Sequence, residues 1–304
     1  MSEKKQAQTT GHVWDDDLQE LNNPLPAWWL WAFYLSILFS IIYWIIYPAW
    51  PIGKGFTTGI GKIEYVNKEG QKKVTHWNTR ALLEKDMQLA REKQKPFFDK
   101  ISATPYEQIA KDTELSNFVA SAGKVLFSEN CAACHQSGGQ GKMAFAPNLT
   151  DDDWLYGGTY DKIQETITNG RKGVMPAKGG ANLSEEEIVQ AANYVLSLSS
   201  IPVDASMAKA GDAIFHGKGG CFGCHGADGK GMQAIGSANL TDKIWLWADV
   251  PSQPTTEAKV EAVKHVITTG LNKGVMPAWN QRLTEQQIKM LSSYVHDTLG
   301  GGKK

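Results

Sequence analysis

The sequence predicts a mainly α-helical chain with one N-terminal transmembrane helix followed by two tandem copies of a helical domain. Three observations lead to this prediction: an uncharged apolar run of 21 residues begins at Ala27, the chain repeats itself from about residue 116, and each copy holds one Cys-x-x-Cys-His motif. The expected segments are an N-terminal stretch (1–26), an anchor (27–50), a linker segment (51–115), a first domain (116–200) and a second domain (205–300).

Length and charge restrict the class of protein. The 304 residues fit two or three domains, and 31 basic side chains nearly balance 32 acidic ones, so that the net charge is −1. This balance gives no electrostatic reason to expect nucleic-acid binding. Residues 1–26 are polar and show no pattern that would form a core.

The apolar run from Ala27 to Tyr47 contains no charge. A helix of this length spans about 31 Å, close to the hydrocarbon thickness of a bilayer, so we expect membrane lipid around it. A buried soluble helix and a cleaved signal peptide fit less well, because the run is long, begins late and is not followed by a small-residue cleavage site. Aromatic residues lie at both ends, as at membrane interfaces (Trp28, Trp29, Trp31, Tyr47 and Trp50).

The segment from the anchor to about Leu115 has a mixed pattern. Residues 61–77 are strand-like or irregular, and Thr79 to Lys95 has helical periodicity that we expect Pro96 to end. The segment is too small to predict as an independent domain. It either packs on a partner or serves as a tether.

The internal repeat predicts the same succession of helices in each domain. Matching landmarks appear in the same order: an Ala-Gly pair, the Cys-x-x-Cys-His motif, Asn-Leu-Thr, a middle helix, Gly-Val-Met-Pro-Ala and a last helix that begins with a capping box. The second copy has a longer loop around Trp247 to Thr256. The matched positions are Gly123 and Gly211, Asn148 and Asn239, Ile163–Ile167 and Val260–Ile267, 173–177 and 274–278, Ser184 with Glu187 and Thr284 with Gln287, and Tyr194-Val195 and Tyr294-Val295.

The two Cys-x-x-Cys-His motifs are attachment signatures for c-type haem. Two thiols one helical turn apart can form thioethers to both vinyl groups of one haem, and the next histidine is then held beneath the iron. We therefore predict two covalently bound haem c groups, attached through Cys131 and Cys134 with iron ligand His135, and through Cys221 and Cys224 with iron ligand His225. No cysteine remains for a disulfide. Zinc is a weaker alternative, because a zinc ribbon places its two cysteine pairs much closer together.

A closed haem iron needs a second axial ligand, and thioether ligation raises its potential. Met175 and Met276 are the predicted ligands, because each lies in the same pentapeptide at an equivalent place. Met143 and Met232 do not match in position, and neither do His76, His216, His265 or His296 as histidine alternatives. The sequence leaves open whether each methionine serves its own domain's haem or the other's.

The carbonyl oxygen that orients each proximal histidine can also be predicted. A ligating histidine usually donates its second N–H to such a group. Pro147 is the candidate in the first domain, and Ala238 occupies that place in the second.

The region before and into the anchor carries a more specific resemblance. The stretch from Trp14 to Trp31, with its Asn-Pro-Leu-Pro-Ala-Trp-Trp entry into one apolar helix, strongly resembles subunit III, the di-haem P subunit, of the cbb3-type cytochrome c oxidases. The two haem motifs with Val-Met-Pro loops are similar to tandem cytochrome c domains. The resemblance covers nearly the whole chain.

The resemblance implies a non-catalytic, membrane-anchored electron-entry subunit. Such a subunit takes electrons from donor c-type cytochromes and passes them through a mono-haem c subunit to the haem–copper catalytic subunit, which reduces oxygen and pumps protons. It implies His135, Met175, His225 and Met276 as iron ligands. It also implies a single pass through the bacterial inner membrane with the haem domains in the periplasm. Lysines close to the helix, Lys54 and Lys62, favour the opposite orientation, but covalent haem attachment in bacteria is a periplasmic process.

Two other functions are compatible with part of this pattern. A di-haem peroxidase needs an iron with an open or displaceable ligand, and two matching methionine loops argue against it. A free-standing, membrane-anchored di-haem carrier that is not part of an oxidase would have the same haem domains, and only the anchor region favours the oxidase subunit.

Overall fold

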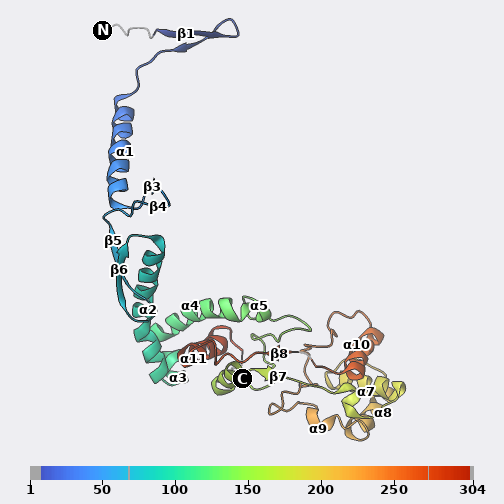
Figure 1. The fold of residues 1–304 in the computed structure, drawn as a ribbon. Coiled ribbons are helices and arrows are strands. Elements are labelled where there is room, and N and C mark those ends of the chain that lie inside the picture. The colour runs from blue at the N-terminus through green and yellow to red at the C-terminus, as the bar shows by residue number, and fades with distance from the viewer. Residues whose placement is uncertain (1–7, 68, 273, 302–304) are drawn as a thin grey trace. The chain divides into compact units, whose positions relative to one another are not determined.

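The computed structural model describes residues 8–67, 69–272 and 274–301. The chain divides into two units, one ending at Gln94 and one beginning at Lys95. Figure 1 shows the succession of elements along the chain.

In the first unit, the predicted anchor is helix α1 (Ala27–Ile46), which is long and apolar enough by length and composition to cross a membrane. None of its residues is buried within the protein. Two antiparallel strands, β1 (Thr9–Trp14) and β2 (Leu18–Leu21), precede it as an exposed hairpin in the stretch where no core pattern was found. Two further hairpins follow it: β3 (Pro51–Ile52) with β4 (Gly55–Phe56), and β5 (Lys62–Val66) with β6 (Lys72–His76).

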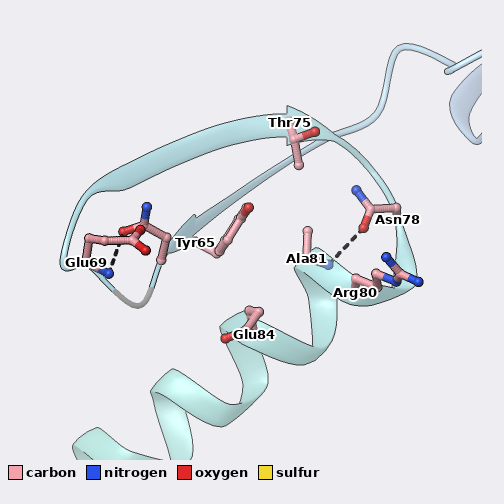
Figure 2. Close-up of a pocket in the computed structure, with 8 residues that line it drawn as sticks. Tyr65, Glu69, Thr75, Asn78, Arg80, Ala81 and Glu84 are labelled. Carbon is pink, nitrogen blue, oxygen red and sulfur yellow. Dashed lines mark hydrogen bonds between the residues drawn. The ribbon is translucent and has the colours of Figure 1, made fainter.

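The β5–β6 hairpin and the beginning of helix α2 (Thr79–Ala103) enclose a polar hollow of about 390 Å³. Figure 2 shows Tyr65 and Thr75 on the hairpin side and Arg80 and Glu84 on the helix side of this hollow. The Asn78 side chain accepts a hydrogen bond from the Ala81 N–H at 2.9 Å and so caps the helix.

The prediction that Pro96 ends this helix is wrong, since α2 continues to Ala103. Proline removes one backbone hydrogen bond and costs stability inside a helix. The turn after it is held by packing, because the rings of Phe97 and Phe98 lie 4.6 Å and 5.5 Å from that of Phe118. Ile101 in the same turn is fully buried.

The second unit contains the two repeats. The first comprises α4 (Thr113–Asn130), α5 (Ala132–His135), α6 (Tyr160–Asn169) and α7 (Glu185–Leu198), preceded by the short helix α3 (Tyr106–Lys111). The second comprises α8 (Ala205–His216), α9 (Phe222–His225), α10 (Thr256–Thr269) and α11 (Glu285–Ser293). Shorter elements complete it: β7 (Arg171–Lys172), a 3₁₀ turn η1 (Ala177–Gly180), β8 (Val275–Met276) and a π-helical turn η2 (Tyr294–Thr298). Both predicted capping boxes are confirmed, at Ser184 with Glu187 and at Thr284 with Gln287.

The last helix of each repeat packs against the other repeat. Helix α7 lies against α8 and α10, and α11 lies against α4 and α6. Figure 1 shows α7 beside α8 and α11 beside α4. Two hydrophobic cores result. The first core is buried between α2, α3, α4, α6, α11 and η2 (Ile101, Ile109, Leu115, Val119, Phe127, Ile163, Ile167, Ile288, Met290, Leu291, Tyr294 and Val295). The second core lies between α7, α8, α10 and the loops beside them (Leu183, Ile188, Ala191, Ala192, Val195, Leu196, Ile214, Ala248, Val250, Val263 and Ile267).

Two equivalent glycines allow these helices to cross closely. A Cβ on Gly123 in α4 would lie 2.9 Å from Cβ of Tyr294, and one on Gly211 in α8 would lie 2.0 Å from the Gln190 carbonyl oxygen. Each glycine therefore allows the end of the other repeat to approach closely, so that each repeat packs its last helical segment against the other repeat.

Candidate functional site

The two haem motifs lie on the short helices α5 and α9. The N–H groups of His135 and His225 donate to the carbonyls of Cys131 and Cys221 at 2.9 Å and 3.0 Å, which closes one helical turn between the first thiol and the histidine. All four thiols are free. In each motif the first cysteine is half-buried and the second is exposed. The thiols therefore have the spacing and the access that covalent attachment requires.

The predicted carbonyl partners of the two histidines are confirmed. Nδ1 of His135 lies 3.0 Å from the Pro147 oxygen, and Nδ1 of His225 lies 2.9 Å from the Ala238 oxygen. Because a carbonyl only accepts, each Nδ1 carries the proton and donates it, which leaves the lone pair on Nε2 for an iron ion. Burial lowers the pKa of both imidazoles, and this hydrogen bond opposes part of the shift.

Two glycines that sequence reasoning did not single out form the bend holding each carbonyl in place. Gly141 and Gly231 each follow the histidine by six residues and have φ values of +67° and +78°. A Cβ on Gly141 would lie 2.5 Å from the Pro147 oxygen, and one on Gly231 would lie 2.9 Å from the Ala238 oxygen. The sequence signal that could have identified them is their equal spacing from the histidine in the two repeats. These two glycines permit a close approach of backbone to backbone.

The structure places the two candidate methionines in the opposite core from their own repeat's haem motif. Met276 packs against the first core, together with Cys131 and Ala132 of the first motif. Met175 packs against the second core, which includes Ile214 of α8. Backbone pairing also joins each methionine to the other repeat, because Met276 pairs with Arg171 and Met175 pairs with Leu271.

Glycines at the ends of the middle helices receive the exchanged methionine loops. Gly170 ends α6 with φ of +69°, and Gly270 ends α10 with φ of +65°. A Cβ on Gly170 would lie 2.4 Å from the Met276 oxygen, and one on Gly270 would lie 2.5 Å from the Met175 oxygen. Each methionine loop is thus seated on the helix end of the other repeat.

The competing ligands have other surroundings. Met143 and Met232 lie in loops and are both 41% exposed. His216 is engaged at both ring nitrogens, by Asp212 and by the Ala227 carbonyl. His296 contacts Asp297 through Nδ1, and its ring lies 3.8 Å from that of Tyr160. His265 is exposed, and His76 belongs to the first unit.

The residues present fit haem c better than zinc. Within residues 8–67, 69–272 and 274–301, no three His, Cys, Asp or Glu side chains group so that they could hold a metal ion. The donor set at each motif is instead one oriented imidazole, with a methionine loop seated in the adjacent core. One imidazole and one thioether are donors that a closed haem iron would take. Fold and site together define a c-type cytochrome with an N-terminal apolar helix.

Comparisons with known proteins identify the family. Residues 6–54 match the family model for the N-terminal domain of cytochrome oxidase-cbb3, FixP, and residues 119–195 and 206–295 match the model for cytochrome c oxidase, cbb3-type, subunit III. The chain belongs to this family of cbb3-type oxidase subunits III, whose cytochrome domains bind haem c.

Similar curated proteins align over nearly their whole length. The cbb3-type cytochrome c oxidase subunit FixP of Azorhizobium caulinodans is 43% identical, with 97% of this chain and 94% of that protein covered. The subunit CcoP of Rubrivivax gelatinosus is 42% identical over 94% of this chain and 83% of that protein. The subunit CcoP of Cereibacter sphaeroides is 38% identical over 97% and 95%.

Proposed function

We propose that this chain is the di-haem, membrane-anchored electron-entry subunit of a cbb3-type terminal oxidase. It takes electrons from donor c-type cytochromes and passes them, through a mono-haem c subunit, towards the haem–copper catalytic subunit. The single observation that carries the proposal is the presence of two equivalent sites, each with an oriented proximal histidine and a seated methionine loop, in a chain of this family.

We further propose that the methionine ligands are exchanged between the repeats. Met276 would serve the iron held by His135, and Met175 the iron held by His225. Met276 and Cys131 both pack against the first core, which supports the first pair, and the packing of Met175 against the second core supports the second. The seating of each loop on Gly170 or Gly270 supports both.

The chain's own residues hold and orient the group and exclude other ligands. Bound haem c would supply a one-electron iron couple and no other chemistry. The thiols of Cys131, Cys134, Cys221 and Cys224 would tie it covalently, and the carbonyls of Pro147 and Ala238 fix the tautomer of each histidine. Met276 and Met175 would bind the iron and so exclude oxygen and carbon monoxide, and we therefore assign oxygen reduction to the partner subunit.

Anchoring sets where the electrons arrive. Helix α1 precedes both haem motifs, so a single pass leaves them on one side of the membrane. We place that side in the periplasm of the bacterial inner membrane, where covalent haem attachment occurs. The acidic stretch Asp15–Asp17 then lies in the cytoplasm.

The test is purification in mild detergent through a C-terminal tag, followed by oxygen uptake with reduced cytochrome c. The proposal predicts copurifying b-type haem and copper, oxygen consumption, and two haem c per chain. A lone c-type protein without oxygen uptake, from membranes that keep other complexes intact, would instead establish a free-standing carrier. Peroxide turnover by the isolated chain would establish a peroxidase.

A further inference from the structure

The segment after the anchor folds back onto the last turn of α1. The N–H of Ile60 donates to the Ile45 carbonyl at 3.1 Å, and the N–H of Gly61 donates to the Ile46 carbonyl at 2.8 Å. Gly59, with φ of +69°, is required there, because a Cβ would lie 2.3 Å from the Ile46 oxygen. These bonds satisfy carbonyls that a helix end otherwise leaves without a partner. The position of this segment is therefore fixed relative to the end of the helix.

The β3–β4 hairpin, which we define as residues 50–57, is attached to the same helix end. The Trp50 and Trp44 rings meet edge to face with centroids 4.7 Å apart. The hairpin is closed by the Thr57 N–H, which donates to the Trp50 carbonyl at 2.8 Å, and by the Trp50 N–H, which donates to the Thr57 hydroxyl at 3.0 Å. Its turn is Gly53-Lys54, with φ of +57° at the glycine.

This hairpin carries large exposed apolar side chains, and so does Ile60, whose backbone N–H bonds to the end of α1. They are exposed in the protein to 51% at Trp50, 64% at Ile52, 55% at Phe56 and 73% at Ile60. Trp50 and Ile52 alternate along one strand and so lie on one face, whereas Phe56 pairs with Pro51 and lies on the other. Apolar groups clustered on both faces of so small a hairpin indicate that a surrounding medium, and not one packed neighbour, covers them.

The neighbouring β5–β6 hairpin has a different surface. Its outward side chains include Lys62, Glu64, Lys72 and Lys73, and Val74 is its exposed large apolar residue among those the structure describes. The change from apolar to charged surface occurs within about ten residues of chain. Such a gradient matches the passage from the acyl boundary of a membrane to water.

We propose that the β3–β4 hairpin is an interfacial anchor that lies in the lipid headgroup–acyl boundary. Helix α1 alone spans about 30 Å, the hydrocarbon thickness, so a hairpin fixed to its end falls at the level where tryptophan is favoured. The Lys54 ammonium at the tip can reach lipid phosphates while its stem stays in apolar surroundings. The hairpin would hold the end of α1 at a constant depth. This inference rests on the membrane anchoring in the proposed function.

The test uses the full holo-chain in phosphatidylcholine vesicles, with single nitroxide labels on Ile52→Cys and Phe56→Cys. Labelling is selective, because the native cysteines are consumed by haem attachment, and the haem absorbance shows that each variant has folded. Accessibility is measured to oxygen, which concentrates in lipid, and to a polar nickel chelate. Leu35→Cys within α1 is the lipid control, and Val74→Cys on the polar hairpin is the water control; both native side chains are 59% exposed.

The proposal predicts that labels at 52 and 56 favour oxygen over the chelate several-fold more than the label at 74, and less than the label at 35. Labels at 52 and 56 that behave like the label at 74 would overturn the hairpin proposal while leaving the anchor intact. Labels at 52 and 56 that become shielded only in the assembled oxidase would also overturn the hairpin proposal, because a protein partner and not lipid would then cover the hairpin. A water-accessible label at 35 would overturn the anchor and the hairpin together.

Discussion

At the residue scale, each site depends on two backbone carbonyls. One accepts the N–H of the histidine, the other belongs to the methionine loop, and a glycine makes room for each of them. The partners of His135 and His225 were predictable, because a ligating histidine needs an acceptor and the repeat shows where one lies. Gly170 and Gly270 could not be assigned a role in advance. Their function is to admit a loop that lies about one hundred residues away in the sequence, and only the packing reveals that contact.

Alanine at Gly170 should displace the Met276 loop. The backbone there has φ of +69°, and a Cβ would lie 2.4 Å from the Met276 oxygen. We expect a loss of about 1–3 kcal/mol in unfolding free energy. We also expect weakening of the far-red absorption band that reports methionine bound to ferric haem.

Gly173→Ala is the matched control. It lies three residues away, and its Cβ would meet only the Tyr156 hydroxyl, at 3.6 Å. It should leave the far-red band unchanged. Equal effects of the two substitutions on that band would contradict the role assigned to Gly170.

The carboxyl group of Asp153 should make the unfolding free energy depend on pH. Burial, together with the nearby carboxylates of Asp242 and Asp151, raises the pKa of its carboxyl from 3.8 to about 6. The folded chain therefore binds more protons than the unfolded chain between those two values. Stability must fall as pH rises through this window and stay lower above it. A shift of this size sets an upper limit of about 3 kcal/mol.

Asp153→Asn should remove this loss. We expect its thermal unfolding temperature to decline less than that of the unaltered chain between about pH 3.5 and pH 6.5, a range that brackets the two pKa values. Thermal unfolding followed at the haem absorbance measures this. Parallel pH profiles for the two proteins would contradict the assignment.

At the scale of elements, the helices themselves were predictable and their partners were not. Periodicity and capping boxes predicted α6, α7, α10 and α11, and the structure confirms them. Since the two repeats carry equivalent apolar faces, hydrophobic pattern alone does not decide which repeat each last helix packs against. The short connection from Leu198 to Ala205 favours α7 beside α8, because helices joined by few residues usually pack as neighbours.

One element departs from expectation for a physical reason, and another has contacts that the sequence does not reveal. Helix α2 passes through Pro96, because the packing of Phe97 and Phe98 against Phe118 compensates for the lost hydrogen bond. The longer loop around Trp247 to Thr256 is present as predicted, but its packing could not be predicted. It contributes Ala248 and Val250 to the second core. Local sequence signals do not report such tertiary contacts.

Core substitutions should reveal the exchange of helices. Leu291 in α11 and Leu196 in α7 are both fully buried, and alanine at either position should cost about 2–5 kcal/mol. Leu291→Ala should speed amide hydrogen exchange in α4 and α6, and Leu196→Ala should do so in α8 and α10, because each removes packing from the opposite repeat. Packing confined within each repeat would give the reverse pattern.

At the scale of the whole molecule, one anchor and two cytochrome units were predictable from an apolar run and an internal repeat. The family followed from the residues that enter the anchor, and the comparisons confirm it. Orientation could not be obtained from charge, because lysines near the helix favour one side and haem attachment favours the other. The residue ranges proposed for the two domains remain a prediction. They delimit the sequence repeats, whereas each part of the packed structure combines helices from both repeats.

The exchange of methionine ligands is the central claim, and a chain with one haem tests it most directly. In the C221S/C224S background only the haem attached through Cys131 and Cys134 remains. Carbon monoxide binding to the ferrous protein is then compared after Met276→Ala and after Met175→Ala. The account predicts that Met276→Ala opens the remaining haem to carbon monoxide and that Met175→Ala leaves it closed. Opening by Met175→Ala, with Met276→Ala still closed, would show that each repeat supplies its own ligand and would contradict the account.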